Sequence, residues 1–215
     1  MKKPVLLCSL VLLAACTRDA PAPVDADPAP AASPAVDADP PAADAAAPAM
    51  APPSFDCAKA VSAAEKQVCG DAELAALDRT LAARYAASPA PDPAVQRGWA
   101  KGRDDCWKAD DARTCVLEAY KTRLVELAMQ APDAAVPKIV KYRCSDNAKP
   151  FTMTYYHDID PQAAVMAWGN DEAIVFPQPA ASGAKYGRAG VEYWEHQGEA
   201  SVDFFGEKLS CRPLA

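Results

Sequence analysis

Apolar residues recur every three to four positions in the first half of the chain, the spacing of one buried helix face. Two runs show this period: Leu74, Leu77, Leu81 and Tyr85, then Val116, Tyr120, Leu124 and Leu127. Asp71 can cap the first run, and Asp92-Pro93 marks another helix start because proline is favoured at the first helical position. The last run ends before Pro132. The pattern predicts a small helical bundle over residues 55–131.

Beyond residue 138 the pattern changes to the two-residue alternation of half-buried strands, as in Phe151, Met153 and Tyr155. Gly169-Asn170-Asp171 lies between two apolar runs and indicates a hairpin turn. Strands are expected at 138–144, 151–157, 163–168, 172–176, 185–188, 191–196, 201–205 and 208–211. Eight short strands with close turns predict an antiparallel β-barrel over 132–215, because closure removes exposed sheet edges. The expected fold class is α+β.

The N-terminus has the composition of an export signal. Two lysines precede a short apolar run, which lacks the roughly 20 residues of a spanning helix. Residues 1–15 therefore read as a signal peptide. Small residues lead into Cys16, and this order resembles the lipobox of bacterial lipoproteins, which implies that Cys16 becomes the acylated N-terminus. Thr17 resembles the sorting pattern for the outer membrane, so the resemblance implies a lipid anchor on its periplasmic face. An ordinary signal peptide with a chance cysteine is the alternative.

Residues 16–54 form a predicted tether. The 38 residues after Cys16 contain 15 Ala, 10 Pro and 6 Asp, and lack Phe, Tyr, Trp, Leu and Ile. Such a segment cannot bury enough apolar surface to offset the entropy of ordering, so we expect it to be disordered. Its proline density favours an extended chain of about 3.1 Å per residue, a reach on the order of 100 Å.

Cysteine spacing supports an oxidising compartment. Without Cys8 and Cys16, six cysteines remain: Cys57, Cys69, Cys106, Cys115, Cys144 and Cys211. An even number in an exported chain implies disulfides. If each predicted domain closes its own bonds, Cys144 pairs with Cys211, and three pairings stay open for the other four. The local pairs Cys57–Cys69 and Cys106–Cys115 are favoured. The sequence has no Cys-x-x-Cys, and its two histidines lie far apart, so a metal site is not expected.

Residues 55–106 carry a recognisable order of residues. Phe55-Asp-Cys-Ala-Lys, Glu65-Lys-Gln-Val-Cys69, Leu77-Asp78, Trp99, Arg103-Asp104 and Cys106 follow one another. This order resembles the LprI-type N-terminal domain, a family associated with lysozyme inhibition in bacterial lipoproteins. The resemblance transfers no contact residues. Glu65, Asp78 and Arg103 are interpreted as solvated residues with ion pairs inside the domain.

The second half has its own signature in residues 179–198. Alanines frame Ser182-Gly183, and Lys185-Tyr186 follows directly, with Tyr193-Trp194 on the next predicted strand. Together with the flanking Cys144 and Cys211, this stretch resembles the MliC/PliC family of inhibitors of c-type lysozyme. The resemblance covers roughly the last 75 residues, the size of a small domain. It implies a β-barrel without catalytic activity or cofactor, whose partner is a c-type lysozyme.

The family resemblance also implies roles for single residues. The Ser182 hydroxyl would bond the two catalytic carboxylates of lysozyme, and Gly183 would let the loop turn. Lys185 would offer a cation to the acidic cleft, while Tyr186 and its aromatic neighbours Tyr193 and Trp194 would hold the loop as barrel packing. The family has a lysine two residues after the Trp, where this chain has His196. His196 is either a replacement contact or an exposed turn residue, and both interpretations stay open.

Charge narrows the classes of partner. The formal net charge is −7, which argues against nucleic-acid binding, because phosphate backbones are captured by basic patches. An acidic chain instead favours encounter with a basic enzyme such as lysozyme. Two other functions remain open. One is an envelope tether that binds peptidoglycan or another envelope protein, and the weaker one is a hydrolase that uses acids such as Asp158, Asp160, Asp171 and Glu172.

Overall fold

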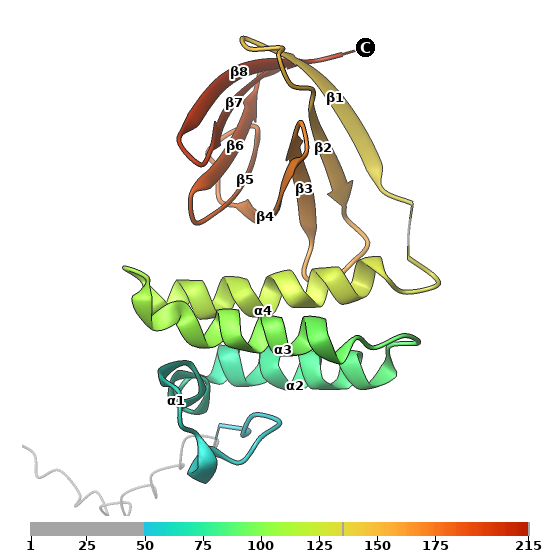
Figure 1. Cartoon of the computed structure of the whole chain (residues 1–215). Helices are drawn as coiled ribbons and strands as arrows, with labels where there is room; N and C mark the ends of the chain where they lie inside the picture. Colours follow the sequence, from blue (N-terminus) through green and yellow to red (C-terminus); the bar gives the residue numbers. More distant parts are fainter. Residues whose placement is uncertain (1–49, 135, 215) are drawn as a thin grey trace, which may run out of the picture. The chain divides into compact units, whose positions relative to one another are not determined.

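The computed structural model describes residues 50–134 and 136–214. Within them, helices occupy the chain up to residue 129, and strands occupy it from residue 138 onward (Figure 1). The predicted α+β class, with a disulfide-linked helical part followed by an eight-stranded antiparallel barrel, is confirmed. The expected signal peptide, the lipidation at Cys16 and the tether up to residue 49 lie outside the described residues. The expectation of disorder is wrong for the end of the predicted tether, because Arg79 donates hydrogen bonds to the carbonyl oxygens of Ala51 and Pro52.

The helical part consists of short elements, many of which begin at a capping side chain. They are η1 (Cys57–Lys59), α1 (Ala63–Gly70), α2 (Ala72–Ala87), α3 (Pro93–Asp104), η2 (Asp105–Lys108) and α4 (Ala112–Met129). The Asp71 carboxylate accepts hydrogen bonds from the first N–H groups of α2. Asp92 does the same for α3, which begins with Pro93. Both helix starts predicted from the sequence are confirmed, because aspartate satisfies N–H groups that have no partner within the helix.

Helix α1 was not among the elements predicted from apolar spacing. It is only eight residues long, with Ala64 and Val68 as its buried residues. A local signal does mark it: the Ser62 side chain accepts from the Glu65 N–H, while the Glu65 carboxylate accepts from the Ser62 N–H. This reciprocal arrangement is a capping box, readable as Ser-x-x-Glu in the sequence.

The helices share one apolar core. Its buried members are Ala64, Val68, Leu74, Leu81, Cys106, Val116, Tyr120, Leu124 and Leu127. Both predicted helical runs contribute to it, and Trp99 packs edge-on against Tyr120 at 5.2 Å between ring centroids. Disulfides join Cys57 to Cys69 and Cys106 to Cys115, the local pairs that the spacing favours. Crosslinks of this kind support a domain whose core is small.

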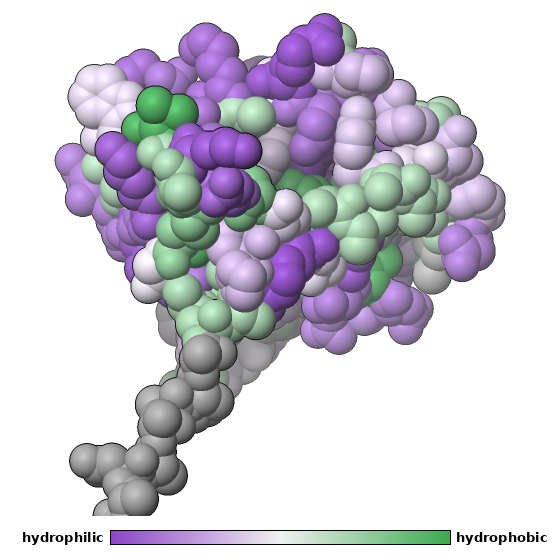
Figure 2. All heavy atoms as spheres, turned by 90° about the horizontal axis from the view of Figure 1, so that it is seen from below, coloured by the Kyte–Doolittle hydropathy of each residue, from purple (hydrophilic) through white to green (hydrophobic). Residues whose placement is uncertain are grey.

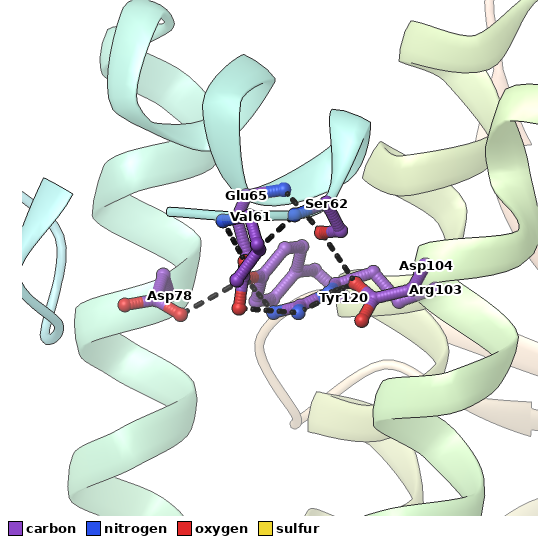
Figure 3. Close-up of polar contacts among 7 residues, drawn as sticks. All are labelled: Val61, Ser62, Glu65, Asp78, Arg103, Asp104 and Tyr120. Carbon is purple, nitrogen blue, oxygen red and sulfur yellow. Dashed lines mark hydrogen bonds and ion pairs between the residues drawn. The ribbon is translucent and has the colours of Figure 1, made fainter. Parts of the chain in front are cut away.

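A buried polar network joins the helices, as Figure 3 shows. Asp78 accepts hydrogen bonds from the Tyr120 hydroxyl at 2.9 Å and from the Ser54 N–H at 2.6 Å. Arg103 donates to the Tyr120 hydroxyl at 3.0 Å and to the Asp104 carboxylate at 2.7 Å. Burial raises the pKa of Tyr120, so its hydroxyl remains a donor to Asp78.

The expectation that Asp78 and Arg103 are solvated is wrong, because they are only 6% and 7% exposed. The expected ion pairs are present: Arg103 lies 3.8 Å from Glu65 and also pairs with Asp104. Apolar spacing could not reveal this network, since it joins residues from α1, α2, α3 and α4. Asp78, Arg103 and the Tyr120 hydroxyl each have a hydrogen-bond partner in this network, as the cost of burial requires.

The barrel strands are β1 (Lys138–Cys144), β2 (Phe151–Tyr156), β3 (Ala163–Trp168), β4 (Asp171–Gln178), β5 (Ala184–Arg188), β6 (Val191–His196), β7 (Glu199–Phe204) and β8 (Glu207–Pro213). Each pairs with the next, and β1 pairs with β8, so the sheet closes. Predicted ends differ from the observed ones by up to two residues. Cys144 and Cys211 lie opposite each other in the β1–β8 ladder and form a disulfide.

Large side chains fill the barrel interior. The buried cluster includes Tyr142, Phe151, Met153, Met166, Trp168, Val175, Tyr186, Tyr193, Val202, Phe204 and Leu209. The hydroxyl groups of Tyr142 and Tyr193 lie 2.8 Å apart, and that of Tyr155 lies 3.3 Å from Tyr193. Because these hydroxyls bond one another, each of the three tyrosines keeps a hydrogen-bond partner in the barrel.

On the face shown in Figure 2, hydrophilic residues predominate and apolar ones form small groups. Scattered apolar residues of this kind are normal for a folded protein. Among the helices of residues 50–134, none combines the length and apolar character needed to cross a bilayer.

We expect Asp78→Ala to lower the free energy of unfolding by about 2–3 kcal/mol, because it leaves the Tyr120 hydroxyl and the Ser54 N–H without an acceptor. The matched control is Glu73→Ala on the same helix, which removes an exposed ion pair with Arg113 and should cost about 1 kcal/mol or less. Urea unfolding of both variants measures the difference. Equal losses would contradict the structural role of the network.

Candidate functional site

The exposed loop between β4 and β5 carries the Ser182-Gly183 motif. Its residues, 179–183, are Pro-Ala-Ala-Ser-Gly, and all five are exposed. Their side chains are small, so the backbone of the loop is accessible from outside. Ser182 brings the only side-chain hydroxyl of these five residues. A loop of this shape can enter a narrow cleft and present one hydrogen-bonding group.

Gly183 holds the loop in a conformation that other residues rarely adopt. Its φ is +74°, in the left-handed region. A Cβ atom at this position would lie 1.9 Å from the carbonyl oxygen of Glu195 and 3.2 Å from the Cα atom of His196. Both neighbours are backbone atoms of β6, which cannot move away without disturbing the ladder. The close approach of Gly183 to β6 therefore fixes where the loop leaves the barrel.

Trp194 also holds the loop in place, through a hydrogen bond to its backbone. Its indole N–H donates to the carbonyl oxygen of Ser182 at 3.1 Å. The Trp194 ring is 41% exposed and stacks on His196, with 6.0 Å between ring centroids and 22° between the planes. The bond to the loop uses the backbone of Ser182, so the Ser182 side chain is not needed to hold the loop in place.

Three aromatic residues are predicted to support the loop by barrel packing, and they divide into two groups. Tyr186 and Tyr193 are buried in the barrel interior, as expected for packing. Tyr186 lies edge-on to Tyr155 and Tyr193, and burial raises its pKa, so its hydroxyl stays neutral. Trp194 instead lies on the outer face, so its expected place in the packing is wrong. It supports the loop by a direct hydrogen bond.

Lys185 lies on the outer face of β5, opposite Trp194 in the ladder. Its ammonium group pairs with the Glu192 carboxylate at 2.7 Å. The Lys185 side chain is 31% exposed and that of Glu192 is 55% exposed. Ion pairs at such accessible positions contribute about 1 kcal/mol or less, so Lys185 can exchange Glu192 for another carboxylate.

His196 is the last residue of β6 and is half-buried, so the interpretation as an exposed turn residue is wrong. The turn itself consists of Gln197 and Gly198, both at positive φ. The Glu195 carboxylate accepts the N–H of Gly198 at 3.1 Å, which closes this turn. His196 therefore stacks on the ring of Trp194, next to the β4–β5 loop, and does not belong to the turn formed by Gln197 and Gly198.

The structure gathers most of the predicted site in one corner of the barrel: Ser182, Gly183, Trp194 and His196. Tyr186 lies behind it in the interior, and Lys185 is turned toward Glu192. Sequence reasoning missed the role of the Glu195 carbonyl and of the Trp194 indole. The glycine after Ser182 indicates a constraint on the backbone, but the sequence does not reveal that the constraint comes from the Glu195 carbonyl on the neighbouring strand. In the described ranges, no cluster of three or more metal-ligating side chains occurs.

Comparisons with known proteins match the barrel part by itself and, separately, more than two thirds of the chain. Residues 142–210 match a family described as membrane-bound lysozyme-inhibitor of c-type lysozyme. The lipoprotein LprI of Mycobacterium bovis and that of Mycobacterium tuberculosis are each 44% identical to this chain over 153 residues. These alignments cover 69% of this chain and 78% of each relative.

A solved structure also shows similarity to part of the chain. It is that of Pseudomonas aeruginosa MliC in complex with hen egg white lysozyme. The sequence identity is 28%, and the match covers 36% of this chain and 82% of that chain, with a TM-score of 0.31.

We expect Gly183→Ala to destabilise the barrel by more than Gly198→Ala, although both glycines have φ between +74° and +79°. The Gly198 variant incurs only the backbone strain of about 1 kcal/mol, since nothing lies within 4 Å of the added Cβ. The Gly183 variant must also displace the backbone of β6. Thermal unfolding of the two variants, with amide exchange of the loop, gives the comparison. Equal melting temperatures would contradict the assigned constraint.

Proposed function

Since the chain belongs to the family of the lipoprotein LprI and carries a stretch that matches inhibitors of c-type lysozyme, we propose that it inhibits c-type lysozyme. The inhibition would occur by insertion of the Ser182-Gly183 loop into the active-site cleft of the enzyme. The observation that carries this proposal is the exposed serine on a loop whose backbone is fixed from both sides. The role is stoichiometric binding, without a catalytic step.

The chemistry of the Ser182 side chain suits a lysozyme cleft. A hydroxyl donates one hydrogen bond and accepts others. A c-type lysozyme has a protonated general acid and an ionised carboxylate that face each other across the cleft. Ser182 can accept from the first and donate to the second, so one small side chain satisfies both catalytic groups. Neither Ala181 nor Gly183 could supply this function, since neither has a polar side-chain atom.

The rigidity of the loop lowers the cost of binding. Ordering a flexible loop at an interface consumes binding free energy, and a loop held in its bound shape avoids that loss. Here the Trp194 indole holds the carbonyl of Ser182, and the approach of Gly183 to Glu195 fixes the next residue. Among residues 50–134 and 136–214, no side chain or backbone group bonds the Ser182 hydroxyl, so the loop presents it free for a partner.

Charge and neighbouring residues support the same partner. The chain carries a formal net charge of −7, which favours encounter with a basic enzyme and raises the association rate. Lys185 can leave Glu192 for an acidic group of the cleft, because their pairing is partly exposed. His196 lies next to the loop on Trp194 and is placed to make the second contact.

We further propose that the protein acts at the bacterial envelope. Its relatives LprI are lipoproteins, and the lipobox-like residues before Cys16 support acylation of this cysteine. Acyl chains would hold the protein on the periplasmic face of the outer membrane. The Ala/Pro/Asp segment up to residue 49 would let the folded part reach a lysozyme on the order of 100 Å away.

We expect Ser182→Glu to abolish inhibition, because it brings a third carboxylate against two others in a water-poor cleft. The inhibition constant should rise at least about a hundredfold, since such like-charge contacts cost several kcal/mol. Asn170→Glu is the control: it adds the same charge at an exposed turn between β3 and β4, at the other end of the barrel. A lysis assay with hen lysozyme measures both. Full inhibition by the Ser182 variant would refute cleft insertion.

A second prediction concerns the division of the chain into 55–131 and 132–215. We expect residues 132–215 alone to fold and to inhibit lysozyme, because they contain the closed barrel, its disulfide and the loop. Circular dichroism establishes whether the fragment folds, and the same lysis assay measures its inhibition. A folded fragment without inhibition would show that the helical part supplies essential contacts.

A further inference from the structure

The outer surface of β1 and β8 carries basic and apolar side chains side by side. The members of this β1–β8 face are Ile139, Lys141, Arg143, Arg212 and Leu214. All five are exposed, and Ile139 and Leu214 remain 60% and 47% exposed although they are large and apolar. They point outward because Tyr142, Cys144 and Cys211, which alternate with them, are buried in the barrel.

Two cations of this face lie directly opposite each other. Arg143 pairs with Arg212 in the β1–β8 ladder, and the Leu214 N–H continues this pairing by donating to the Lys141 carbonyl at 2.8 Å. Like charges at opposed positions of a sheet destabilise it. The stability of the fold therefore does not explain why two arginines lie at opposed positions. A role in binding would explain why this destabilising pair is present.

The positive charge of the face is only partly compensated. Arg212 lies 3.5 Å from the Glu199 carboxylate. Within residues 50–134 and 136–214, no carboxylate lies within ion-pair distance of Lys141 or Arg143. The whole chain is acidic, with a formal net charge of −7. A basic strip on such a chain is a local exception, and it would repel a basic enzyme.

Topology places this face away from the Ser182 loop. The sheet is a closed ring of eight strands in sequence order, and β1 pairs with β8 (Figure 1). The loop joins β4 to β5; around the ring, β4 is three strands from β1 and β5 is three strands from β8. The two features therefore occupy opposite sides of the barrel. A partner can cover the β1–β8 face while the loop stays free.

We propose that the β1–β8 face docks on a membrane surface rich in anionic lipid headgroups. Arginine forms paired hydrogen bonds with phosphate oxygens, and lysine adds a point charge. Exposed apolar side chains among cations are typical of segments that lie in the headgroup region of a bilayer. Juxtamembrane basic residues are attracted to the negative potential of such surfaces. Docking in this way would turn the Ser182 loop away from the membrane.

The test uses the mature chain from residue 16 with Cys16→Ser, so that neither the signal peptide nor an acyl group contributes to binding. Co-sedimentation is measured with vesicles of phosphatidylcholine alone and with vesicles that also contain phosphatidylglycerol. We expect binding that depends on phosphatidylglycerol. The Lys141→Gln/Arg143→Gln variant should bind these vesicles about 25-fold more weakly, at about fivefold per basic residue near an anionic surface.

The control is Lys59→Gln/Lys101→Gln, which removes the same charge from exposed positions of the helical part. It should keep the affinity of the parent chain, because neither Lys59 nor Lys101 belongs to the β1–β8 face. The melting temperature of the Lys141/Arg143 variant should stay the same or rise, since the repulsion with Arg212 is relieved. Equal losses in both double variants, or binding independent of phosphatidylglycerol, would overturn the proposal. Neither result depends on lysozyme inhibition.

Discussion

Closure of the sheet between β1 and β8 is the constraint on which the barrel depends. These strands are the first and last of the ring, and Cys144 and Cys211 join them directly across the ladder. The disulfide encloses a separation of 67 residues, and restricting so long a loop in the unfolded chain contributes about 4 kcal/mol in the chain-entropy account. Without this closure, the barrel would have two open edges, and the aromatic side chains inside it would lose their cover.

The barrel holds the β4–β5 loop in one conformation without requiring the loop to pack its own side chains. The adjacent strand β6 supplies both restraints, the Trp194 indole and the Glu195 carbonyl. Because β6 is hydrogen-bonded on both sides, to β5 and to β7, these groups cannot shift independently of the sheet. The precision of the loop therefore derives from the sheet. The small side chains of residues 179–183 could not provide it by packing, since they have little surface to bury.

Periodicity and capping chemistry account for how much of this fold the sequence reveals. Leu74, Leu77 and Leu81 recur at helical spacing, and Asp71 and Asp92 mark helix starts, so those helices follow from local rules. Alternation likewise locates the strands, with ends displaced where pairing extends beyond the apolar run. The burial of Asp78 and Arg103 cannot be predicted from such local rules, because it depends on which helices pack against one another. The same limit applies to the site: Ser182 and Gly183 stand out locally, whereas their contacts with β6 arise only in the ring.

The attachment of the loop through backbone atoms separates its shape from its chemistry. Ser182 is held by its carbonyl oxygen, which every amino acid possesses, and the side chain of that residue takes no part in the restraint. Gly183 admits no replacement, because even one methyl group would meet the Glu195 carbonyl. Mutational tolerance therefore differs sharply between two adjacent positions. The side chain at position 182 can therefore change during evolution while the loop keeps its shape. A related protein that binds a different enzyme could present another side chain from the same loop backbone.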